Sequence, residues 1–156
     1  MGGTMNADIL FSIANGVAMA GWGILLLYYS LEHRFPLFRR PVEQAWIPLL
    51  LSVFYALVLT LSFTGLVPGS SGDFSSLAGV RSLFESDYAL LAGWAHYLAF
   101  DLLVGIRIGL EAKRHGVSIF ILIPVWFFAF MFGPAGYALW RFIRPMLIKG
   151  QQEGMV

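Results

Sequence analysis

Apolar residues run along this chain in four long stretches that short polar segments separate. The stretches cover about residues 7–30, 46–67, 88–110 and 117–140. About twenty residues of α-helix cross a hydrocarbon layer of ~30 Å, and each stretch reaches that length. The pattern therefore predicts an all-α membrane protein, in which a bundle of four transmembrane helices forms a single domain over residues 1–156.

The composition supports a membrane environment. Hydrophobic residues make up 58% of the chain and charged residues only 12%, whereas soluble domains carry roughly 25% charged residues. We expect membrane lipid around the helices. A net charge of +1 gives no reason to expect a nucleic-acid partner, and the absence of cysteine excludes disulfides and thiolate metal sites.

Basic residues in the connections bear on orientation. If four helices cross, five Lys or Arg residues lie on one side and four on the other; the first group is Arg34, Arg39, Arg40, Lys113 and Arg114, and the second is Arg81, Arg141, Arg144 and Lys149. Because basic loops tend to stay in the cytoplasm, both chain ends are expected outside it. The chain begins without an Arg- and Ser-rich transit segment, so we expect a multi-pass protein of a bacterial inner membrane.

Two titratable side chains interrupt the third apolar stretch near its middle. His96 and Asp101 lie only ~5 Å from the bilayer centre at 1.5 Å rise per residue, where an Asp costs about 2.5–3.5 kcal/mol. Hydrocarbon favours the uncharged, protonated form of such a carboxyl. The two side chains are about 140° apart around the helix, so both helix faces are expected to look into the protein. We predict them as catalytic residues; the alternative is that they only form hydrogen bonds between helices.

Further residues are predicted to bind a substrate around this pair. Asn15 is the other deep polar side chain, Arg107 shares the His96 face, and Tyr97 lies one turn before Asp101. Aromatic residues make up 16% of the chain, and the deep ones suit a slot for a flat apolar polyene, although composition alone favours simple packing or lipid contact. The remaining predicted binding residues are Trp22, Trp94, Trp126, Phe130 and Pro134, the last of which frees the Phe130 carbonyl.

A metal site is not expected. Ligands on one helix face are three or four residues apart, whereas His96 and Asp101 are five apart. The other two histidines, His33 and His115, belong to connections, and no glycine-rich phosphate loop is present. We therefore expect no metal and no cofactor.

The motif around the pair resembles a known family. Gly93-Trp94-Ala95-His96-Tyr97-Leu98-Ala99-Phe100-Asp101-Leu102-Leu103, together with Phe132-Gly133-Pro134-Ala135-Gly136, is similar to the ABA4-like (abscisic acid deficient 4) membrane proteins. Plant members of that family sit in the plastid envelope and are required to make neoxanthin from violaxanthin, a step that opens an epoxide and forms an allene. The resemblance implies a carotenoid-linked role carried by His96 and Asp101.

Three functions follow from these observations. The first is a cofactor-independent carotenoid or xanthophyll isomerase or epoxide-rearranging enzyme, with Asp101 as general acid and His96 taking or relaying the proton. The second is a non-catalytic carotenoid-binding or pigment-complex assembly subunit, and the third is a small transporter that uses a midplane Asp. Since four helices enclose little volume, a homodimer would be one way to complete a site.

Overall fold

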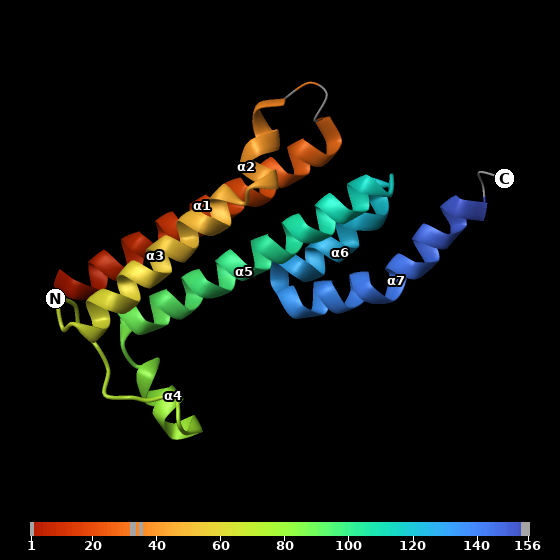
Figure 1. Cartoon of the computed structure of the whole chain (residues 1–156). Helices are drawn as coiled ribbons and strands as arrows, with labels where there is room; N and C mark the ends of the chain where they lie inside the picture. The colour runs from red at the N-terminus through yellow and green to blue at the C-terminus, as the bar shows by residue number, and fades with distance from the viewer. Residues whose placement is uncertain (1, 32–33, 35, 154–156) are drawn as a thin grey trace. The chain divides into compact units, whose positions relative to one another are not determined.

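A computed structural model shows an entirely helical chain over its described residues, which are 2–31, 34 and 36–153. These residues form α1 (Gly2–Leu31), α2 (Arg39–Glu43), α3 (Trp46–Phe63), α4 (Leu77–Leu83), α5 (Asp87–Arg114), α6 (Ile119–Met131), α7 (Gly133–Glu153) and a 3-10 helix, η1 (Pro36–Phe38) (Figure 1). Within this part of the chain, three helices are long and apolar enough to cross a membrane: residues Ala7–Leu31 of α1, α3 and α5. The predicted class is therefore confirmed, together with the first three apolar helices.

Glycine in a left-handed conformation ends two of these helices. Gly65 follows α3 with φ 74°, and Gly116 follows α5 with φ 59°, a region that costs glycine little. In each case the amide after the glycine donates to a carbonyl five residues earlier, Leu66 to the Leu61 carbonyl (3.1 Å) and Val117 to the Ala112 carbonyl (3.0 Å). These bonds satisfy carbonyls that the helix end leaves open, so α3 stops four residues before the predicted end at 67.

The chain divides into two compact units, and the division crosses α1 and α5. Unit 1 comprises Met1–Met19 and Ile47–Ala99, and unit 2 comprises Ala20–Trp46 and Phe100–Val156. In unit 1, small residues of α1 and α5 pack on α3, among them Ala14, Ala18 and Ala99 against Leu51. Small side chains let helix backbones approach closely. This close packing matters in lipid because no hydrophobic force drives the helices together there.

Unit 2 holds the end of α1 in place with a lysine from α5. Lys113 Nζ donates to the carbonyls of Tyr28 (3.2 Å) and Tyr29 (3.3 Å) and lies 4.7 Å from the centre of the Tyr28 ring. The Tyr29 hydroxyl donates in turn to the Val117 carbonyl. The last carbonyls of a helix have no intrahelical partner and attract cations, so Lys113 acts as a side-chain cap of α1.

The predicted fourth helix, residues 117–140, is two helices. The helical conformation breaks at Phe132 (φ −153°, ψ 71°), between α6 and α7. Pro134 then occupies the first turn of α7, where a proline is tolerated because its N–H would have no partner. A side chain at Gly136 would collide with the backbone of Ala129. Glycine there allows α7 to turn back closely against α6.

The pair α6–α7 runs along the second half of α5 and returns. Trp126 of α6 donates from Nε1 to the Gly105 carbonyl (3.0 Å), and Gly133 lies against Asp101. Trp140 of α7 donates from Nε1 to Glu111 (2.7 Å), which lies ten residues after Asp101 and close to the end of α5. The contacts thus describe a helical hairpin that reaches the level of Asp101 and comes back; the predicted four-helix bundle is not confirmed.

The capping role of Lys113 is testable. Lys113→Met should lower the stability of the protein in detergent by about 2 kcal/mol, because it removes charge-assisted hydrogen bonds to two carbonyls and a cation–π contact. Thermal unfolding followed by circular dichroism measures this loss. Arg40→Gln is the matched control, since Arg40 is exposed and should change stability little; equal losses in both variants would contradict the role.

Candidate functional site

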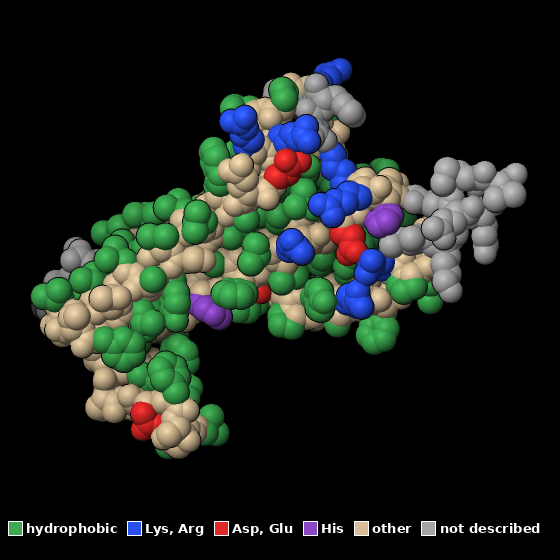
Figure 2. Space-filling model, in the orientation of Figure 1, with side chains coloured by type: hydrophobic (Ala, Val, Ile, Leu, Met, Phe, Trp, Pro, Cys, Tyr) green, Lys and Arg blue, Asp and Glu red, His purple; other side chains and the backbone are tan. Residues whose placement is uncertain are grey.

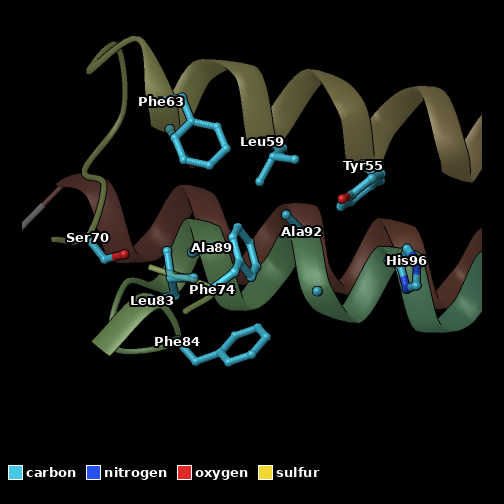
Figure 3. A pocket seen from close by; sticks show the side chains of 12 residues that line it. Tyr55, Leu59, Phe63, Ser70, Phe74, Leu83, Phe84, Ala89, Ala92 and His96 are labelled. Carbon is cyan, nitrogen blue, oxygen red and sulfur yellow. The ribbon is translucent and has the colours of Figure 1, made fainter. Parts of the chain in front are cut away.

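An apolar cavity of about 270 Å³ lies in unit 1 between α3, α4 and α5. Figure 3 shows the side chains of α3 on one wall and those of α5 on the other. The lining residues are Tyr55, Leu59, Ser62, Phe63, Ser70, Phe74, Leu83, Phe84, Ala89, Ala92, Gly93 and His96. Most of this lining is aliphatic or aromatic, with a few polar groups, which is the usual make-up of a site for an apolar ligand.

His96 supplies an imidazole group to this cavity. It projects from α5 and is exposed on the surface of the chain, so the expectation of a fully interior His96 face is not met. The Tyr55 ring of α3 packs edge-on to the imidazole, with ring centres 5.3 Å apart. A neutral imidazole donates from one nitrogen and accepts at the other, which suits proton transfer at the cavity.

The connection from α3 to α5 closes one side of the cavity and is held by its own polar side chains. Ser86 donates from Oγ to the Pro68 carbonyl (2.7 Å), and Ser76 caps α4 by accepting from the Gly79 amide (3.0 Å). Asp73 accepts from the Ser75 hydroxyl (2.6 Å) and amide (2.7 Å). These bonds hold the pKa of the Asp73 carboxyl below its ordinary value, so the turn keeps its charged acceptor as pH falls until that lowered pKa is reached.

Ser70 brings a hydroxyl to the cavity from the same connection. Its Oγ is buried and has no hydrogen-bond partner within the described chain. A buried hydroxyl without a partner costs free energy, and a polar atom of a ligand would satisfy it. Ser62, by contrast, bonds the Val58 carbonyl of its own helix (2.9 Å).

Asp101 belongs to unit 2 and is buried, with 5% of its surface exposed. Its Oδ1 lies so close to Gly133 that a Cβ atom there would overlap it. The carboxyl thus faces the first residue of α7. The expectation of an interior Asp101 is met, and the group lies at the break of the α6–α7 hairpin.

One family model matches the part of the chain that holds these residues. The model described as ABA DEFICIENT 4-like matches residues 9–140, which include His96, Asp101 and Gly133. This chain belongs to the ABA4-like family. The family is linked by name to xanthophyll and neoxanthin biosynthesis. No individual curated protein and no solved structure matches the chain.

Three predicted binding residues of the ABA4-like chain form a separate group in unit 1. Asn15 accepts at Oδ1 from Trp94 Nε1 (3.1 Å), and its amide donates to the Phe11 carbonyl (2.8 Å). Trp94 stacks on Tyr97 with ring centres 5.5 Å apart. None of the three lines the cavity of His96, and the Asn15–Trp94 bond ties α1 to α5. A substrate role for them stays a prediction.

The other predicted binding residues lie in unit 2. Trp22 packs edge-on to Phe130 at 5.7 Å, and the Trp126 ring meets Tyr29 at 5.4 Å. Arg107 lines a different, polar pocket, and Pro134 is exposed beside Gly133. Within this unit these aromatic side chains form pairwise contacts between helices. Of the histidines named in the sequence, His33 lies outside the described residues.

Sequence reasoning missed Tyr55 and Ser70. Tyr55 lies on the helix that also bears Ser52, Thr60 and Ser62, whose hydroxyls bond carbonyls of their own helix, as helix hydroxyls commonly do. A tyrosine hydroxyl extends too far from the backbone to bond a carbonyl of its own helix. This difference was the feature of the sequence that could have pointed to Tyr55. Nothing in the sequence singles out Ser70 from its neighbour Ser71.

The contact between Asp101 and the hairpin predicts a cost for any side chain at Gly133. Gly133→Ala should lower stability by about 1–3 kcal/mol, because the added methyl group overlaps a buried carboxyl. Gly16→Ala is the control, since no atom lies within 4 Å of the position of its Cβ. Thermal unfolding of Gly133→Ala, Asp101→Ala and the double variant completes the test. If the two losses simply add, the contact is not the cause.

Proposed function

We propose that this ABA4-like chain is a cofactor-independent membrane enzyme that isomerises or rearranges a carotenoid or a related isoprenoid polyene. The observation that carries the proposal is the cavity in which an apolar lining ends at His96. An apolar substrate reaches such a cavity from lipid without crossing water. The family membership supports a xanthophyll as the class of substrate.

The size of the cavity suggests which part of a polyene it encloses. Its volume of about 270 Å³ is just below the ~300–1,000 Å³ that is typical of ligand sites. A long polyene with a ring at each end therefore enters with one end only, and the rest lies along the apolar surface of the helices in lipid. The end ring is the part of an epoxy-xanthophyll that carries the epoxide.

The chemistry needs proton transfer and no redox step. To convert an epoxide to an allenic alcohol, a base removes a proton from the chain carbon next to the ring while the epoxide C–O bond opens. The electron pair of the broken C–H bond becomes the new C=C bond, and the oxygen gains a proton, so the product is an isomer. His96 is proposed to accept the proton at the carbon, and such positioned groups contribute about 10²–10⁴-fold to rate.

Asp101 stays a second candidate for proton transfer on its place in the sequence motif alone, because its side chain does not line the cavity of His96. As a protonated carboxyl it would act as general acid. Because Asp101 also contacts the start of α7, its substitution is paired below with a stability measurement.

The role of His96 is tested by pigment analysis. The chain is expressed in cells that produce violaxanthin or another carotenoid, and the pigments are separated by chromatography. The wild-type chain should change the pigment profile, and His96→Gln should reduce that conversion at least about 100-fold. Asp101→Asn should do the same at unchanged helical content.

His115→Gln is the matched control, because His115 follows α5 and does not line the cavity. Conversion by His96→Gln at the wild-type rate would refute the proposal. Purified protein that retains an unaltered pigment in stoichiometric amount, with no conversion, would identify a carotenoid-binding subunit instead.

Filling the cavity provides an independent prediction. Ala89→Leu adds three carbons at the α5 wall and should block entry of the polyene end, so that conversion falls about tenfold or more while the protein remains folded. Ala56→Leu makes the same change at an exposed position of α3 outside the lining and should leave conversion unchanged. Equal conversion by both variants would show that the substrate binds elsewhere.

A further inference from the structure

Four arginines gather around a second pocket, of about 240 Å³, in unit 2. Arg107 and Arg114 come from the last two turns of α5, and Arg141 and Arg144 come from α7. The hairpin described above makes this possible, because α7 returns along α5 and brings its own arginines to those of α5. Figure 2 shows Lys and Arg side chains over α2, near the end of α5 and over the middle of α7.

One carboxylate lies among the four arginines. Glu111 binds Arg144 Nε through Oε1 (2.9 Å) and accepts from Trp140 Nε1 through Oε2 (2.7 Å). Both oxygens are thus engaged, and Arg144 is partly neutralised. Among the residues that the structure describes, Arg107, Arg114 and Arg141 form no hydrogen bond or ion pair.

The pocket is therefore short of negative charge. Four guanidinium groups face one carboxylate, which leaves a formal excess of three positive charges in a concave site. A guanidinium presents paired N–H donors that match two phosphate oxygens. A carboxylate ligand would accept hydrogen bonds from the same donors. Phosphate is favoured because lipid headgroups present it at high local density at the polar edge of a membrane.

The location of the pocket fits a lipid headgroup. Arg114 is the last residue of α5 and Arg107 lies two turns earlier, so the pocket lies at one end of a helix long enough to cross a membrane. Its lining includes the buried Trp140, and basic pockets between membrane helices bind anionic lipid headgroups. Arg141 and Arg144 lie beyond residues 9–140, which the family model matches.

We propose that this pocket binds the phosphodiester group of an anionic phospholipid. None of its residues lines the cavity of His96, so the inference goes beyond the proposed enzyme function. The lipid phosphate lies between the arginines of α5 and those of α7 and so holds the hairpin against α5.

The test measures lipid retention on the purified full-length chain by native mass spectrometry. Phosphatidylglycerol, phosphatidylcholine and inorganic phosphate are titrated separately. Phosphatidylglycerol should bind at least tenfold more tightly than phosphatidylcholine. The double variant Arg107→Gln/Arg141→Gln should lose about thirtyfold in affinity for phosphatidylglycerol, at about fivefold for each arginine near a membrane surface.

Two further variants distinguish binding in this pocket from general electrostatic attraction between the protein and anionic lipid. Arg34→Gln/Arg40→Gln removes the same charge at exposed positions outside the pocket and should retain phosphatidylglycerol as the wild type does. Glu111→Gln releases Arg144 and should tighten binding a few-fold, whereas a variant that only damaged the fold would weaken it.

Equal losses in the two double variants, or weaker binding by Glu111→Gln, would overturn the proposal. Retention of inorganic phosphate with the same dependence on Arg107 and Arg141, but no preference for phosphatidylglycerol, would identify free phosphate as the ligand and overturn the lipid assignment.

Discussion

The carboxyl group of Asp101 lies against Gly133, where α6 ends and α7 begins. The first amides of a helix have no intrahelical partner, and the positive end of the helix dipole attracts an acidic side chain. An open backbone is tolerated at membrane depth only where protein covers it. The buried carboxyl of α5 and the break between α6 and α7 thus lie together, and the space that Gly133 leaves is what lets the hairpin approach α5 at this point.

Hydropathy and length were enough to predict the three apolar helices of the fold. Each is a continuous stretch of apolar residues, and a chain in hydrocarbon has to satisfy its backbone by forming helix. The break at Phe132 was missed because the apolar stretch continues through it. Pro134 was expected to free the Phe130 carbonyl within one continuous helix. Gly133 and Gly136 instead make room for a carboxyl and for a neighbouring helix, and such space depends on tertiary contacts that the sequence does not show.

The candidate site was predictable in part for a similar reason. His96 and Asp101 stand out because polar groups are costly in an apolar helix, and the structure places each in a distinct environment, one at a cavity and one at the hairpin. Their partners could not be derived from spacing along α5. Tyr55 comes from another helix and Ser70 from a connection, and the deep tryptophans turn out to bond or stack in pairs within each unit.

The hairpin also changes how the chain is threaded through a bilayer. At 1.5 Å per residue, α6 with its 13 residues extends only about 20 Å, less than the ~30 Å of hydrocarbon, and α7 then leads back toward the end of α5 from which α6 came. Among the described residues, the helices long and apolar enough to cross a membrane are Ala7–Leu31, α3 and α5, and neither α6 nor α7 is one of them. An apolar helix of less than full length that turns back along a longer helix makes the number of such helices smaller than the number of apolar stretches in the sequence.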